Sequence, residues 1–131
     1  MTINDFSLGD KFQYLGRETM CVPYSRFSYN YAINAVDIKT GSTLHVSKER
    51  QLQPIEVHFS YAARDSVKTF DKLFMGDKFF YNGELLVKCN SFVNTKLNRV
   101  DAFCLTDGKM YRIWDNEKVF PAYEIKKEYS K

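Results

Sequence analysis

Two stretches of sequence decide the fold: Gly9-Asp10-Lys11-Phe12-Gln13-Tyr14-Leu15-Gly16 and Gly76-Asp77-Lys78-Phe79-Phe80-Tyr81-Asn82-Gly83. They lie 67 positions apart and share Gly-Asp-Lys-Phe, the tyrosine and the final glycine. Alternation of side chains such as Lys-Phe-Gln-Tyr is typical of a β-strand, and Leu-Gly or Asn-Gly after it is typical of a tight hairpin turn. The sequence therefore predicts the same strand and turn twice.

The same offset continues without a gap along the chain. It pairs Ala35 with Ala102, Gly41 with Gly108, and Pro54 with Pro121. Seven further pairs are apolar in both copies: Leu8/Met75, Ile33/Val100, Val36/Phe103, Ile38/Leu105, Leu44/Tyr111, Val46/Ile113 and Leu52/Val119. Because apolar spacing and turn residues recur together, we interpret the chain as an internal duplication of one fold.

The duplicated pattern predicts an all-β protein of two tandem five-stranded SH3-like barrels. Residues 1–57 form the first repeat and residues 73–131 form the second. Each pattern contains short alternating segments, tight glycine turns and a late proline at the start of a last strand, where a missing N–H is tolerated. An OB-fold is the alternative, but it needs longer strands and a helix between the third and fourth.

Residues 58–72 link the two repeats. We expect a short helix over residues 60–72, with Ser60 as its cap and Tyr61, Val67 and Phe70 as apolar anchors. The segment contains no glycine or proline, so it does not have the composition of a flexible tether. Each repeat alone has a small core, and we expect the two to pack rigidly. The charged residues 126–131 are expected to fray.

Composition limits the class of protein. The 131 residues carry a net charge of +3, and 16% of them are aromatic. The positive excess lies in residues 58–131, because residues 1–57 are balanced. An odd set of three cysteines without a metal-type spacing indicates reduced thiols. With no apolar run of membrane-spanning length and no signal-peptide pattern at the N-terminus, we expect a cytoplasmic protein without a membrane partner.

No motif indicates catalysis, a metal site or a cofactor. Asp10 and Asp77 stand just before the first strand of each repeat, where a side chain caps a turn. His45 and His58 have no spaced Cys, Asp or Glu partners of the kind that bind metal. Phosphate-binding glycine loops and nucleophile elbows are absent from the sequence. An enzyme is therefore the least favoured of the functions considered.

The most informative polar segments follow the second predicted strand of each repeat, and we expect both to be loops. They cover residues 24–31 and 91–99 and interleave aromatic rings with basic and amide side chains. Such a composition suits base stacking and phosphate neutralisation, and it equally suits a protein-binding surface or a roof over a small barrel. The candidate binding residues, with one from the basic set near the fourth strand, are Arg26, Tyr29, Phe92, Lys96, Arg99 and Arg112.

The repeated pattern consists of turn and core residues and their equivalents 67 positions later: Gly9, Asp10, Phe12, Tyr14, Gly16, Asn34, Ala35, Ile38, Gly41, Val46 and Pro54. This pattern resembles that of small accessory proteins of tailed bacteriophages. The resemblance implies a fold and an origin in phage, with action on host DNA, transcription or defence components in the host cytoplasm. The barrel also looks like KOW and Tudor modules, which bind nucleic acid or modified peptides. For a Tudor-type cage, Tyr24, Phe27, Tyr29 and Tyr31 supply rings that the second repeat matches poorly.

The sequence thus predicts a non-enzymatic accessory protein that contacts DNA through basic and aromatic loops. The alternative is a protein-interaction module that inhibits or modulates a host factor. Nothing in the sequence points to a small-molecule cofactor.

Overall fold

The protein is built mostly of β-strands, as a computed structural model of residues 1–28, 31–94 and 98–129 shows. The prediction of a mostly-β chain is confirmed. In residues 1–55 the elements are η1 (Ile3–Asp5), β1 (Lys11–Tyr14), β2 (Arg17–Ser28), β3 (Tyr31–Asp37), β4 (Thr43–Leu44) and β5 (Gln53–Ile55). From residue 57 onward they are β6 (Val57–Ala63), β7 (Lys68–Thr69), η2 (Phe70–Lys72), β8 (Lys78–Tyr81), β9 (Glu84–Asn94), β10 (Asn98–Cys104), β11 (Met110–Tyr111) and β12 (Lys118–Tyr129).

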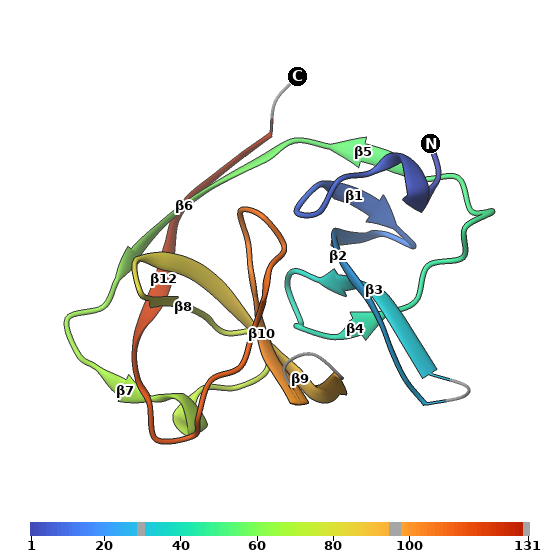
Figure 1. The fold of residues 1–131 in the computed structure, drawn as a ribbon. Coiled ribbons are helices and arrows are strands. Elements are labelled where there is room, and N and C mark those ends of the chain that lie inside the picture. The colour runs from blue at the N-terminus through green and yellow to red at the C-terminus, as the bar shows by residue number, and fades with distance from the viewer. Residues whose placement is uncertain (29–30, 95–97, 130–131) are drawn as a thin grey trace.

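The strands form two sheets that repeat one order. The first sheet has the order β4-β3-β2-β1-β5, and the second has β11-β10-β9-β8-β12 with β6 added at its edge. The strands curl as in a half-barrel (Figure 1). The first five strands of the second order are the equivalents of the five strands of the first order, in the same sequence. The offset of 67 residues therefore holds for the strand order as well as for the amino-acid sequence.

The turns repeat as closely as the strands. Leu15 and Asn82 open the two equivalent hairpin turns with φ values of 51° and 52°, and each is followed by a glycine at positive φ. Left-handed φ is unfavourable for most residues, but asparagine and glycine adopt it readily. Two positive φ values in succession let a two-residue turn match the twist of its strands, so these turns set the register of both hairpins.

Within the described residues, the core consists of three clusters related by the repeat. One cluster lies within the first repeat around Phe12, and an equivalent cluster lies within the second around Phe79. The largest cluster lies between the repeats and takes equivalent residues from both: Met20/Val87, Val22/Cys89, Ile33/Val100, Val36/Phe103 and Ile38/Leu105. Since small units bury little surface alone, this shared cluster gives each repeat part of its core.

A two-stranded ribbon of β6 and β12 joins the two sheets (Figure 1). In this ribbon Ser60 pairs with Lys126, and Phe59 pairs with Lys127. Lys127 is the equivalent of Ser60, and Phe59 is the equivalent of Lys126, so exchanging the repeats turns one pair into the other. The centre of the ribbon therefore lies on a local two-fold axis between the repeats. The last strand of each repeat therefore crosses to pair with the last strand of the other.

The helical linker predicted for residues 60–72 is wrong. Residues 57–63 are strand β6, and helix is limited to the three residues of η2. The alternating Val57-His58-Phe59-Ser60-Tyr61 segment is rich in β-formers, and twelve-residue β12 offers it an antiparallel partner. The same pairing carries β12 as far as Tyr129, so the prediction that residues 126–129 fray is also wrong.

The two segments predicted as loops after the second strands are largely strands. β2 continues to Ser28 and β9 continues to Asn94, and each pairs with the following strand around register shifts. Such irregularities allow a long hairpin to bend while it stays paired. Arg26 and Phe92 therefore lie in strands, whereas Tyr29 and Lys96 lie outside the described residues.

Candidate functional site: an arginine–tryptophan surface

The buried carboxylate of Asp101 supports a surface that contains two of the predicted binding residues, Arg99 and Arg112. Asp101 on β10 is fully buried, and its Oδ2 accepts a hydrogen bond from the backbone N–H of Ile113 at 3.0 Å. Its Oδ1 accepts from Arg99 Nε at 2.7 Å and from Ser91 Oγ at 2.6 Å. One side chain thus fixes the Arg99 guanidinium beside the chain segment that follows β11.

That segment presents an exposed indole under a guanidinium. Cζ of Arg112 lies 4.2 Å from the ring centroid of Trp114, which is within cation–π distance. Trp114 is 58% exposed and is the one tryptophan of the sequence. Its backbone N–H donates to Glu117 Oε2 at 2.7 Å, and Arg99 reaches Asp115 at 3.5 Å. We call Arg99, Arg112 and Trp114 the arginine–tryptophan surface.

The charges on this surface are mixed. The hydrogen bond and the charge of Asp101 raise the pKa of Arg99, which keeps its guanidinium cationic. Asp115 lies 3.5 Å from Arg99, and Glu117 accepts from the backbone N–H of Trp114, so the local excess of positive charge is small. A ligand of this surface therefore gains from aromatic and directed hydrogen-bond contacts more than from bulk electrostatic attraction.

The first repeat has the same scaffold without this surface. Asn34 occupies the position of Asp101, and it accepts from the N–H of Val46 at 2.8 Å and donates to the Val46 carbonyl at 2.9 Å. At the positions of Arg99, Arg112 and Trp114 the first repeat has Ala32, His45 and Ser47. The scaffold is thus common to both repeats, and the arginine–tryptophan surface belongs to the second.

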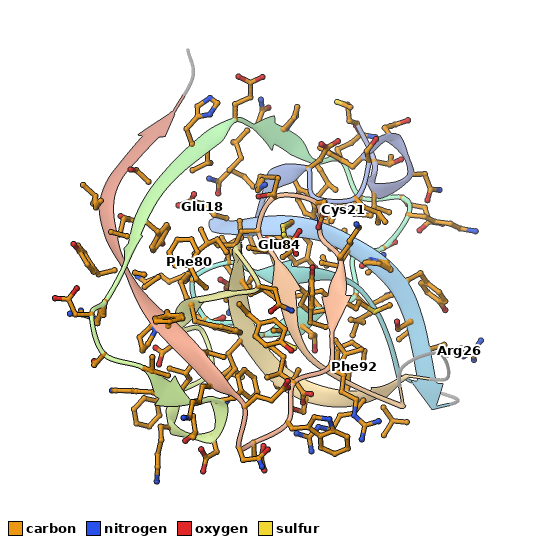
Figure 2. The ribbon with its side chains drawn as sticks, turned by 60° about the vertical axis from the view of Figure 1, so that its left-hand side comes forward. Glu18, Cys21, Arg26, Phe80, Glu84 and Phe92 are labelled. Atoms are coloured by element: carbon orange, nitrogen blue, oxygen red, sulfur yellow. The ribbon has the colours of Figure 1, made fainter. Side chains whose placement is uncertain are left out.

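The predicted site residues do not all meet. Arg99 and Arg112 lie on neighbouring segments, because Asp101 binds both Arg99 and the backbone N–H of Ile113. Arg26 lies near the far end of β2 (Figure 2). Phe92 is 6% exposed and stacks on Phe103 with 6.1 Å between ring centroids, so its ring is part of the shared core. Sequence reasoning did not select Trp114, although a lone tryptophan next to a basic residue in a polar crossing between strands was a usable signal.

Two cavities beneath the ribbon form a second candidate region. A cavity of about 620 Å³ lies at the first hairpin turn and includes Arg17, Asp37 and Lys78 in its wall. A cavity of about 370 Å³ lies at the equivalent hairpin turn of the second repeat, and Tyr61 of β6 lines both. Figure 2 shows Glu18, Phe80 and Glu84, which line these cavities, between the ribbon and the rest of the molecule.

The smaller cavity holds a group of possible metal ligands. Atoms of Glu84, Cys104 and Asp107 lie within 4.8 Å of one another. Tyr111 donates a hydrogen bond to Glu84. Burial raises the pKa of the Cys104 thiol, which therefore keeps its proton at neutral pH. A metal ion at this group would have to displace that proton, because a metal-bound cysteine is a thiolate.

The fold and these surfaces define the chain as an internally duplicated β-protein, with two curled sheets joined by a shared ribbon. Comparisons with protein-family models, curated proteins and solved structures find no match. Within the described residues, no helix has the length and apolar character needed to cross a membrane.

Proposed function

We propose that the protein is a non-enzymatic binding protein that contacts nucleic acid through the arginine–tryptophan surface. The observation that carries this proposal is the exposed Trp114 ring, held 4.2 Å from the guanidinium of Arg112. Nucleic-acid-binding surfaces combine aromatic rings, on which bases stack, with arginines that contact phosphates. Arg99, oriented by Asp101, adds a second cation to the same face.

We propose further that each repeat is a five-stranded SH3-like barrel. The shared strand order, β4-β3-β2-β1-β5 and β11-β10-β9-β8-β12, supports this architecture. In such small barrels function lies in loops and strand ends at the rim. The arginine–tryptophan surface occupies this kind of place, because it follows the short strand β11.

The experiment is a binding titration with DNA at two salt concentrations. The Arg99→Ala/Arg112→Ala variant should bind more weakly than the unmodified chain, because it loses two cations from the surface. The matched control is Lys48→Ala/Arg50→Ala, which removes two cations from the equivalent turn of the first repeat. Equal losses in both variants, or no DNA binding at low salt, would remove the basis of the proposal.

A protein partner is the second candidate. It is favoured by the pairing of Arg99 with Asp101 and Asp115, which lowers the net charge offered to a polyanion. Val93, directly across from Arg99 in the β9–β10 ladder, is 65% exposed, and Trp and Arg are frequent hot-spot residues. A chain that binds no DNA at low salt but captures one host protein, with loss of capture in Trp114→Ala, would support this candidate.

The phage-type accessory role and the action on a host factor remain predictions. They rest on the repeated Gly-Asp-Lys-Phe motif and its turn and core residues. Those residues determine fold, and the binding chemistry lies elsewhere, on the arginine–tryptophan surface.

A further inference from the structure

We infer that this surface selects single-stranded nucleic acid and stacks one unpaired base on Trp114. The inference rests on the proposed function and specifies its ligand. In a duplex each base is already stacked on its neighbours, so an indole ring stacks on a base that is unpaired. Three features of the site lead to this assignment: the exposure of the ring, the stiffness of its support and the balance of charge.

The ring is open although an arginine covers part of it. Trp114 remains 58% exposed with the Arg112 guanidinium 4.2 Å from its centroid. A base stacked on this ring gains contact with the indole, and the adjacent guanidinium provides both a flat surface and a charge for the phosphate. Arg112 and Trp114 together are therefore suited to one nucleotide.

The support of the ring is ordered in the free protein. The backbone N–H of Trp114 donates to Glu117 Oε2 at 2.7 Å, and the N–H of Glu117 donates back to the Trp114 carbonyl at 3.0 Å. Next to this turn, the N–H of Ile113 donates to the buried carboxylate of Asp101. An aromatic ring on a turn held in this way loses little conformational freedom on binding.

The charge balance disfavours a duplex. Duplex binding draws much of its affinity from neutralising many phosphates. Here Asp115 lies 3.5 Å from Arg99, and Glu117 binds the backbone N–H of Trp114, so few phosphates can be neutralised. With two phosphate contacts on a single strand, the logarithm of affinity should fall against the logarithm of salt with a slope of about −1.4. Stacking then contributes a large part of the binding.

Each chain has one such site. The equivalent of Trp114 in the first repeat is Ser47, which has no ring, and the equivalent of Arg99 is Ala32. The two-fold relation of the repeats therefore does not extend to this site. One strand per chain is the expected stoichiometry.

The test uses the full chain and the fluorescence of its single tryptophan. An oligothymidylate of about 12 nucleotides and a duplex of equal length are titrated separately. We expect the single strand to quench Trp114 and to bind more tightly than the duplex. In a parallel anisotropy titration with labelled single strand, Trp114→Ala should bind on the order of 5- to 100-fold more weakly. Trp114→Phe, which keeps an aromatic face, should lose much less.

Three results would overturn the inference. If the duplex binds as tightly as the single strand, or if Trp114→Ala binds the single strand like the unmodified chain, base stacking is excluded while DNA binding stands. If neither nucleic acid binds, the proposed function fails together with the inference. Thermal unfolding of both variants checks that they are folded, and an exposed ring on a surface turn should alter it little.

Discussion

The side-chain ammonium of Lys11 donates a hydrogen bond to the backbone carbonyl of Leu105 in the other repeat, at 2.6 Å. Its equivalent, Lys78, donates to the carbonyl of Ile38 at 2.5 Å. Lys78 is the equivalent of Lys11, and Ile38 is the equivalent of Leu105, so the second contact is the first with the two repeats exchanged. This contact between the repeats is therefore made twice, as a contact across a symmetric dimer interface is.

Loss of this contact should destabilise the whole chain. Lys11→Met keeps the aliphatic stem and removes the charged donor, and we expect a loss of about 1.5–3 kcal/mol in the free energy of unfolding. The measurement is chemical denaturation. Lys39→Met, at an exposed lysine, is the matched control and should change stability by less than about 0.5 kcal/mol. Equal stability of the two variants would contradict a structural role for the Lys11–Leu105 contact.

The glycine turns allow a second matched comparison. Gly16 and Gly41 have nearly equal positive φ values of 77° and 76°, so alanine at either costs roughly 1–2 kcal/mol of backbone strain. A Cβ on Gly16 meets nothing within 4 Å, whereas a Cβ on Gly41 would collide with the carbonyl of Lys88 in the other repeat.

We therefore expect Gly41→Ala to be destabilised by at least about 2 kcal/mol more than Gly16→Ala, because overpacking adds to the strain. Thermal unfolding measures the difference. Similar melting temperatures for the two variants would mean that the backbones of the repeats do not approach each other at this turn.

Asp101 should matter for stability as well as for the surface. Asp101→Ala leaves the N–H of Ile113 and the hydroxyl of Ser91 without their acceptor, and we expect a loss of about 3–5 kcal/mol. Asp101→Asn should lose less, because Asn34 in the first repeat makes the corresponding contacts to Val46 with an amide. Denaturant titration of both variants is the measurement, and an asparagine variant as unstable as the alanine variant would contradict the equivalence.

The three thiols should resist modification in the folded protein. Burial raises the pKa of Cys21, Cys89 and Cys104, so few thiolates are present at pH 8. We expect slow reaction with a thiol reagent in buffer and rapid reaction of all three in denaturant. Rapid reaction of any one of them in the native state would contradict its burial.

The same pKa shifts fix the sign of a pH effect. A thiol with a raised folded-state pKa contributes stability that is present below the ordinary pKa of about 9. The unfolded chain releases these protons first as the pH rises, so stability should fall through and above that value. Denaturation midpoints measured between pH 7 and pH 10 check the direction.

The elements that the sequence predicted correctly are those in which one residue type has one local role. The glycine turns and the alternating Lys-Phe-Gln-Tyr strand each depend on local geometry, and the repeat showed them twice. The second repeat begins before residue 73, where the sequence predicted its start, because Phe70 has the place in its core cluster that Ile3 has in the cluster of the first repeat. Ile3 and Phe70 have dissimilar side chains, so comparison of the two sequences did not show that they are equivalent.

The remaining structure depended on partners distant in sequence. The path of residues 57–63 followed from pairing with β12, a partner that the alternating side chains of the segment do not identify. Phe92 was selected for its aromatic ring, but the repeat interface buries it against Phe103. Trp114 was not selected because its proposed role depends on Arg112 beside it and on its exposure, and exposure is a tertiary property.

Binding of a single strand at the arginine–tryptophan surface is tested most directly by a nuclear magnetic resonance titration of the full chain with a short single-stranded oligonucleotide. We expect the signals of the Trp114 indole N–H and of the side-chain N–H groups of Arg99 and Arg112 to shift most, while signals around Ser47 in the first repeat stay in place. Shifts concentrated around Tyr61 and the cavities beneath the ribbon, or no shifts at low salt, would contradict it.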